Sequence, residues 1–232
     1  MSEFYNRALE MKDEFVQIRR HFHMNPERGL DLPKTVDYVM EQLKSWGYDP
    51  KPLGKGGVVA TAGGKKPGKV IMLRGDMDAL PMTEEADIPF ASTNGFMHAC
   101  GHDMHTTMLL GAAKMLKEKE DELEGTVKFM FQPGEEIFAG AQEMLNHGIL
   151  ENPKVDVALG LHVFSGDKLD VGNVYYGVGN LEASCDGFEI TVHGKGSHGA
   201  LPQMSIDPIN VAAHIHTALQ EIIAREVNPG AT

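Results

Sequence analysis

The chain has 232 residues, of which 42% are hydrophobic and 23% charged, enough apolar side chains for a sizeable folded core. A formal net charge of -12 argues against nucleic acid or an anionic membrane as the main partner. The two cysteines, Cys100 and Cys185, are too few for a disulfide framework, and the charged N-terminus resembles no signal peptide. With no apolar run near 18 residues, we expect a cytoplasmic protein without a membrane span.

Two helical segments are predicted within the first 46 residues. Apolar residues recur at helical spacing over residues 3–24, and again from Thr35 to Trp46. The turn-forming stretch 25–29 separates the two patterns, and Gly47 stands where a helix C-cap is expected.

Strands then alternate with helices. The predicted strands are 57–62, 69–74, 125–131 and 156–161, and the predicted helices are 106–117 and 139–146. We interpret the last of these strands as buried. This alternation indicates an α/β fold with a mostly parallel sheet, in which functional groups gather at the carboxyl ends of the strands.

The pattern changes near residue 182. Residues 188–193 alternate as in a half-solvated antiparallel strand, and 206–227 form a long amphipathic helix. One strand and one helix are too little for an independent core. We therefore predict one domain over residues 1–181 and the start of a second, α+β domain over residues 182–232.

The densest cluster of reactive side chains is Met97–His105. It contains three histidines, Cys100 and Asp103 directly before a predicted helix, and these side chains are the usual ligands of zinc and similar ions. Gly101 would let the backbone turn so that Cys100 and His102 face one point. A single such residue would more often be packed in a core, but this density favours a metal site.

Further polar residues follow the predicted strands. Glu135 and Glu136 come after one strand, and a carboxylate beside a metal-bound water can act as a general base. Asp78 follows another strand and His162 ends a third, whereas His198 stands in a glycine-rich loop. Taken singly, these would be read as a solvated acidic pair, a turn cap, a core histidine and a surface histidine.

Together, these stretches resemble the dinuclear metallo-amidohydrolase and carboxypeptidase family, which includes hippurate hydrolases and N-acyl amino acid amidohydrolases. The resemblance runs from residue 19 to 208 through RRHFHMNPE, RGDMDALPMTEE, MHACGHDMHTTMLLGAA, FQPGEE, LGLHV and GKGSHGALPQMSIDPI. It implies hydrolysis of the amide bond of an N-acyl amino acid or a related small conjugate, and a homodimer for the full-length protein. It also implies that residues 1–181 form an incomplete catalytic, metal-binding domain and residues 182–232 part of a lid or dimerisation domain. It also implies two divalent ions, Zn or Mn first, with Co or Ni also suited to such ligands.

The resemblance also implies a role for each residue. The metal ligands would be Cys100, as a thiolate bridging both ions, with His102, His162 and Glu136. Glu135 would be the general base, and His198 would polarise the scissile carbonyl, typically across a dimer interface. Asp78 and Asp103 would hold ligands in place.

Two departures from the family pattern stand out. Arg28, Leu32 and Pro33 interrupt a stretch that is usually Pro-Glu-Leu-Gly followed by an acidic pair, which predicts only a local change. The family also continues well past residue 232 and supplies one more histidine ligand, so the chain reads as C-terminally truncated. Two alternatives stay open: a cysteine hydrolase with Cys100 as nucleophile, and a non-catalytic fragment that binds only metal or a partner chain.

Overall fold

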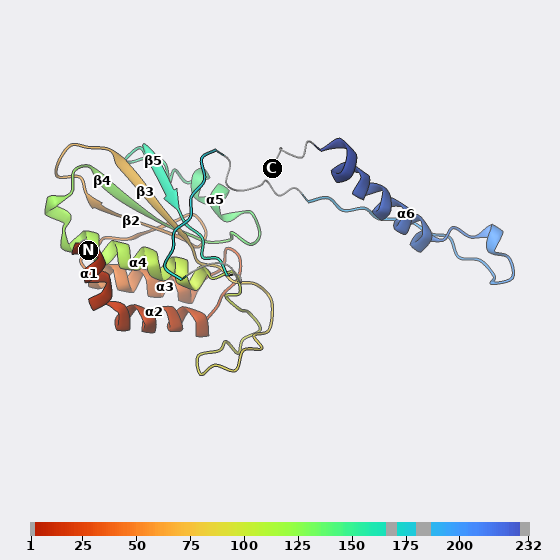
Figure 1. Cartoon of the computed structure of the whole chain (residues 1–232), viewed down its shortest axis with the longest axis horizontal. Coiled ribbons are helices and arrows are strands. Elements are labelled where there is room, and N and C mark those ends of the chain that lie inside the picture. Colours follow the sequence, from red (N-terminus) through yellow and green to blue (C-terminus); the bar gives the residue numbers. More distant parts are fainter. Residues whose placement is uncertain (1–2, 166–170, 180–186, 228–232) are drawn as a thin grey trace. The chain divides into compact units, whose positions relative to one another are not determined.

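The structure is a computed structural model that describes residues 3–165, 171–179 and 187–227. The chain divides into two compact units, residues 1–167 and 168–232, and each is described by itself (Figure 1). The predicted boundary between residues 181 and 182 lies outside the described residues and stays a prediction.

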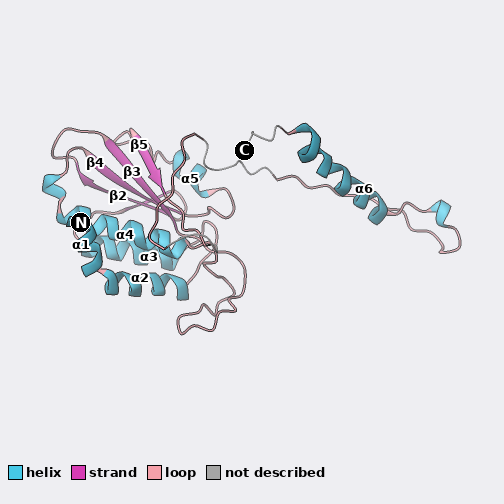
Figure 2. Cartoon of the chain, in the orientation of Figure 1, coloured by secondary structure: helices cyan, strands magenta, loops and turns pink. Residues whose placement is uncertain are grey.

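The first unit is built on one five-stranded sheet with the order β1-β2-β4-β3-β5 (Figure 2). The strands are β1 Lys51–Leu53, β2 Gly57–Gly63, β3 Val70–Asp76, β4 Thr126–Gln132 and β5 Val157–Gly160. β3 is parallel to β4 and β5, whereas β2 is antiparallel to β1 and β4, so four strands run one way and only β2 runs the other. This confirms the predicted α/β fold with a mostly parallel sheet. The short β1 was not predicted, because Lys-Pro-Leu carries no strand pattern.

The helices of this unit are α1 Glu3–Glu10, α2 Lys12–Met24, α3 Pro33–Ser45, α4 His102–Glu118 and α5 Gly140–Asn146. The prediction of a single helix over residues 3–24 is wrong, because the first helix ends at Glu10 and the second begins after Met11. Met11 is buried at that break, whereas α1 has no buried residue and is tied to α4 by an ion pair between Arg7 and Glu118. The helix predicted from Thr106 begins four residues earlier, so His102 and His105 lie within the first turns of α4.

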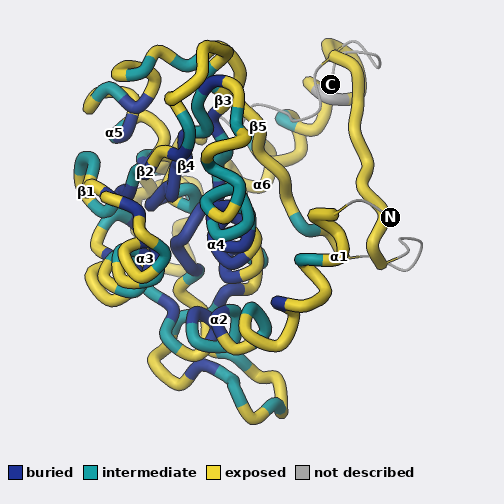
Figure 3. Tube along the Cα trace, turned by 90° about the vertical axis from the view of Figure 1, so that its left-hand side faces the viewer, coloured by how far each residue is buried: buried dark blue, intermediate teal, exposed yellow. Residues whose placement is uncertain are grey.

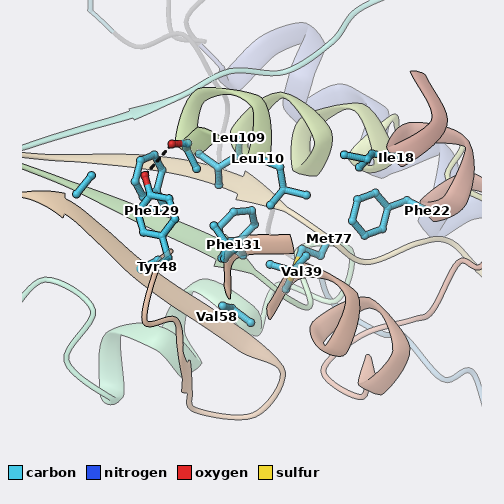
Figure 4. Close-up of a cluster of buried hydrophobic side chains, with 14 of the residues drawn as sticks. Ile18, Phe22, Val39, Tyr48, Val58, Met77, Leu109, Leu110, Phe129 and Phe131 are labelled. Carbon is cyan, nitrogen blue, oxygen red and sulfur yellow. Dashed lines mark hydrogen bonds between the residues drawn. The ribbon is translucent and has the colours of Figure 1, made fainter. Parts of the chain in front are cut away.

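The core lies between the sheet and the helices α2, α3 and α4, which share one face of the sheet (Figures 3 and 4). β4 shows how the pleat divides the two faces. Phe129 and Phe131 point into this main core, whereas Met130 joins a smaller cluster on the opposite face with Met144 of α5. The sheet is therefore covered on both faces along its centre, as expected for parallel strands.

β5 corrects one prediction. The sequence favoured a buried strand at residues 156–161, but all four residues of β5 are exposed, and Leu159 is 56% exposed. The reason is its position: within the described part of the chain, β5 pairs only with β3 and forms a lateral edge of the sheet. A continuous apolar run cannot distinguish an edge strand from a central one.

The second unit contains α6, Pro208–Glu221, which continues into a π-helical turn at Ile222–Glu226. The side chain of Asp207 caps α6 by accepting hydrogen bonds from the backbone N–H groups of Ile209 and Asn210. The strand predicted at residues 188–193 is wrong: no ladder forms there, and the described residues nearby make only an isolated bridge between Lys195 and Ile206. A strand needs a hydrogen-bonded neighbour, and none of the described residues supplies one. No helix among the described residues is long and apolar enough to cross a membrane.

A buried lysine gives a first prediction. Lys128 of β4 is 2% exposed, and its ammonium donates hydrogen bonds to the backbone carbonyls of Ile149, Glu151 and Pro153. A Lys128→Met variant keeps the apolar stem but leaves these carbonyls without their donor, so we expect the free energy of unfolding in urea to fall by about 3 kcal/mol. Lys51→Met is the control, because Lys51 is exposed and pairs with the exposed Asp49; this variant should change stability by less than about 0.5 kcal/mol. Equal stability of the two variants would contradict the prediction.

Candidate metal centre

The parallel strands bring the predicted site residues to one end of the sheet. Because β3, β4 and β5 run in the same direction, their carboxyl ends lie side by side at that end of the sheet. Asp78 follows β3, Glu135 and Glu136 follow β4, and His162 follows β5. His102, in the first turn of α4, lies at the same end of the sheet. The sequence predicted that functional groups would gather at the carboxyl ends of the strands.

His102 is at the middle of this cluster and is fully buried. Its Nδ1 lies 2.8 Å from the backbone carbonyl oxygen of Asp78, which can only accept, so Nδ1 carries the proton in the neutral ring and Nε2 carries the lone pair. Nε2 is buried without a hydrogen-bond partner, and carboxylate oxygens of Asp76, Glu135 and Glu136 lie 3.6, 3.7 and 3.8 Å away. A lone pair facing three carboxylates is unfavourable unless a cation or a proton lies between them. The geometry therefore fits a metal ion at this point.

Cys100 and His162 form the second half of the cluster. The Cys100 Sγ lies 3.3 Å from His162 Nε2, while His162 Nδ1 donates to the backbone carbonyl of Val163 at 2.6 Å. The neutral ring of His162 therefore directs its lone pair at the thiol. Burial, together with the carboxylates of Glu136 and Glu135, raises the pKa of the Cys100 thiol to about 12. A thiolate would form here only when a bound cation offsets these negative charges.

The possible ligand atoms form three groups among the described residues, within each of which all atoms lie within 4.8 Å of one another. One contains Cys100, His102 and His162, and another contains His102, Glu135 and Glu136. The third contains His102 with Asp76 and His105. The structure thus brings together all four predicted ligands and the predicted base. Their individual roles stay predictions.

His198 lies in the second unit, where the backbone N–H of Ala200 donates to its Nδ1 at 3.2 Å. Its predicted role at the scissile carbonyl stays a prediction.

Asp78 connects the ends of two strands with α4. It is fully buried, and its carboxylate accepts hydrogen bonds from the backbone N–H groups of Glu135, at 2.9 Å, and Glu136, at 3.2 Å. Its own backbone carbonyl accepts from His102. Asp78 therefore orients both glutamates and one histidine through the backbone, whereas the sequence suggested only that it would hold a ligand.

Asp103 faces away from this cluster into a buried ionic network. Its Oδ2 lies 2.7 Å from His23 Nδ1 and 2.8 Å from Arg19 Nε, and the other ring nitrogen of His23 lies 2.8 Å from Glu84. The network anchors the first turn of α4 to α2. Its link to the predicted metal ligands is indirect, through the neighbouring His102. Sequence reasoning missed His23 and Glu84, because only the fold brings them beside Asp103.

This network predicts how stability depends on pH. The hydrogen bond that His23 donates to the Asp103 carboxylate raises the pKa of His23, although burial opposes it. Conversely, burial alone would raise the pKa of Asp103 and of Glu84, but hydrogen bonds lower both, with His23 the largest such contribution for Asp103 and the Ser92 backbone N–H for Glu84. The stability from a raised histidine pKa is complete below about pH 6.5 and is lost as the pH rises through the folded-state pKa. The stability from lowered carboxyl pKa values is complete above about pH 4 and is lost on acidification.

We therefore expect the thermal midpoint of the metal-free protein to be highest between about pH 4.5 and 6.5. His23→Gln should flatten the decline on the alkaline side, measured by thermal unfolding in the presence of EDTA. The control His147→Gln changes a half-exposed histidine directly after α5 and should retain the wild-type slope. Identical slopes for the two variants would contradict a charged His23.

Three buried residues of the motifs were not given individual roles from the sequence. Asp76 Oδ1 and His105 Nδ1 lie 2.6 Å apart, next to His102. His98 is 5% exposed, neither of its ring nitrogens has a hydrogen-bond partner, and burial lowers its pKa to about 4. Their only sequence signal was membership of dense motifs.

Comparisons with known proteins agree with this picture. A model of the family described as peptidase family M20/M25/M40 matches residues 72–232. The N-acyl-L-amino acid amidohydrolase of Geobacillus stearothermophilus is 43% identical over 223 residues, which cover 95% of this chain and 59% of that protein. The IAA-amino acid hydrolase ILR1-like 5 of Arabidopsis thaliana is 44% identical over 220 residues, covering 94% and 49%.

A solved structure is also similar. The Bacillus subtilis YXEP protein, described as a dinuclear metal binding peptidase from the M20 family, superposes with a TM-score of 0.62. It is 39% identical, and the match covers 65% of this chain and 42% of that one. This chain spans about half the length of the curated relatives it matches.

Proposed function

Because the chain belongs to peptidase family M20/M25/M40, we propose that it carries the metal centre of an amidohydrolase. The proposed substrates are N-acyl amino acids or related small conjugates. The observation that carries the proposal is the buried, unpartnered Nε2 of His102, surrounded by carboxylates and next to Cys100 and His162. The names of the relatives support the substrate class: one is an N-acyl-L-amino acid amidohydrolase and another an IAA-amino acid hydrolase.

The proposed cofactor is a pair of divalent ions held by Cys100, His102, Glu136 and His162. Such ions polarise a carbonyl oxygen and lower the pKa of the attacking water. Imidazoles, a thiolate and a carboxylate suit Zn, and the same ligands accept Mn, Co or Ni according to availability. The group with Cys100 and the group with the glutamates share His102, and this favours two adjacent positions over two separate sites.

The exposed fractions of their side chains support different roles for the two glutamates. The side chain of Glu136 is 17% exposed, whereas that of Glu135 is 36% exposed. We infer that Glu136 holds metal and that the more accessible Glu135 takes a proton from the attacking water and passes it to the leaving amine nitrogen. His198 would supply a hydrogen bond to the oxyanion, in a homodimer from the partner subunit.

The rival cysteine hydrolase is disfavoured by electrostatics. A thiol nucleophile reacts as its thiolate, and burial and the nearby carboxylates hold the pKa of Cys100 near 12. A chelator separates the two reactions, because EDTA should stop a metal-dependent hydrolase and leave a thiol hydrolase active.

The metal content of the purified chain, measured by elemental analysis after reloading with Zn or Mn and desalting, tests the proposal first. We expect about two ions per chain, and addition of EDTA should remove both the ions and any hydrolysis of N-acyl amino acids. A folded chain that retains no metal after reloading would refute the proposed function. Metal binding without hydrolysis would favour the alternative of a fragment that binds only metal or a partner chain.

A cytoplasmic location stays a prediction.

A further inference from the structure

We propose that His105 is a positioning residue, which holds the ligand His162 in place through a hydrogen bond to the backbone N–H of Val163. His105 is 2% exposed and lies on α4 one turn after His102. Its consequence for metal binding rests on the proposed function, whereas the contact itself is a property of the chain.

The hydrogen bonds of His105 fix its tautomer. The Val163 backbone N–H donates to His105 Nε2 at 2.9 Å, so Nε2 must carry the lone pair. Nδ1 then carries the proton and donates to Asp76 Oδ1 at 2.6 Å. The opposite tautomer would place two N–H groups against each other at Val163 and leave the carboxylate without its donor.

Asp76 is fixed from several directions. Its Oδ2 pairs with Arg74 Nη1 at 2.8 Å, and its backbone carbonyl accepts from the Thr106 hydroxyl at 2.7 Å. Burial alone would raise the pKa of Asp76, but His105 and Arg74 lower it to about 2, so it stays a carboxylate. A charged, immobile acceptor keeps the proton of His105 on Nδ1.

Val163 is held by its side chain as well. Gly101 has a φ of +85°, and a Cβ at this position would lie 2.4 Å from Val163 Cγ2. The valine therefore packs directly over the glycine between Cys100 and His102, while its N–H is bound to His105. Residues 161–165 form no regular secondary structure, so these two contacts limit how the segment can move.

His162 receives its orientation from this arrangement. Its Nδ1 donates to the Val163 carbonyl, and its ring meets the His105 ring edge-on, with centroids 4.5 Å apart. Fixing Val163 therefore fixes the direction of His162 Nε2, which points at Cys100. His105 belongs to the third group of possible ligand atoms, with Asp76 and His102, but both of its ring nitrogens already have hydrogen-bond partners. It would therefore influence His162 through Val163.

The wild-type chain tests the contact without any metal. In the EDTA-treated protein, nitrogen NMR of the imidazole should show His105 protonated at Nδ1. Hydrogen exchange should show the Val163 amide at least about tenfold slower than the unbonded rate of its sequence. A proton on Nε2, or an unprotected Val163 amide, would overturn the proposal.

Two amide variants separate the two hydrogen bonds. In His105→Gln, the longer side chain places an oxygen where Nε2 was, so it can still accept from Val163. In His105→Asn, the shorter side chain can donate to Asp76 but cannot reach Val163. We expect Val163 protection to survive in the Gln variant and to be lost in the Asn variant, while the core amides of β4 stay protected in both.

Zinc affinity gives the second readout. The Zn dissociation constant of His105→Asn should rise by about 10- to 100-fold, and that of His105→Gln by much less. Equal loss in both variants, or none in either, would overturn the positioning role. If the wild-type chain binds no zinc, the proposed function fails, and the exchange measurement still decides whether His105 holds Val163.

Discussion

Cys100→Ser is expected to remove most of the bound metal from the protein. The hydroxyl of serine resists deprotonation far more than a thiol, so the variant loses the charged ligand that would bridge two ions. The side chain is nearly the same size, and a serine hydroxyl can still form hydrogen bonds with His162 Nε2 and Glu136, the two partners of the thiol. Elemental analysis after reloading with Zn should therefore show about two ions per chain in the wild type and one or none in the variant.

The other cysteine provides the matched control. Cys185 lies outside the described residues and outside the strand-end motifs, so Cys185→Ser should keep the wild-type metal content. Full metal content in a folded Cys100→Ser protein would refute the bridging role. Loss in both variants would instead indicate general damage to the protein from replacing a cysteine.

Glu135→Gln is expected to lower hydrolysis of N-acyl amino acids by about 10²- to 10⁴-fold while the metal stays bound. Glutamine keeps the shape of the side chain, and the backbone N–H that binds Asp78 is unaffected. Only the ability to accept a proton from water is lost. Turnover and metal content are measured on the same preparation, so that loss of the base is not confused with loss of the ions.

Glu136→Gln is the comparison that separates the two glutamates. Because Glu136 is the less exposed carboxylate and would act as a ligand, this variant should lose metal affinity as well as turnover. Near wild-type turnover in Glu135→Gln would show that the base is a different residue. Loss of metal in Glu135→Gln alone would reverse the two roles.

Sequence reasoning found the sheet and most of the site because both leave local patterns. Apolar runs followed by charged residues identified the ends of β3 and β4, and the parallel direction of the strands then places Asp78 near Glu135. The dense motif around Cys100 needed only the turn at Gly101, whose φ of +85° agrees with the expected role of this glycine. Local sequence patterns were therefore enough to identify which residues gather at the carboxyl ends of the strands.

Features that depend on long-range packing were not predicted. The exposure of β5 depends on which strands pair with it, and the break at Met11 depends on what α1 and α2 each contact. The same holds for the network in which Asp103 meets His23, 80 residues away along the chain. No local sequence pattern predicts such long-range contacts, because each residue alone looks like an ordinary polar side chain.

The parallel pairing of β3 with β5 also has a consequence for biosynthesis. His162 leaves the ribosome 62 residues after Cys100 (162 − 100), a delay of roughly 3 to 12 seconds at about 5–20 residues per second. During that interval the nascent chain presents a cysteine and histidines whose final partner has not yet been made. Binding of an ion by all four proposed ligands would therefore have to follow synthesis of His162, and an ion captured earlier would be held by an incomplete set of these ligands.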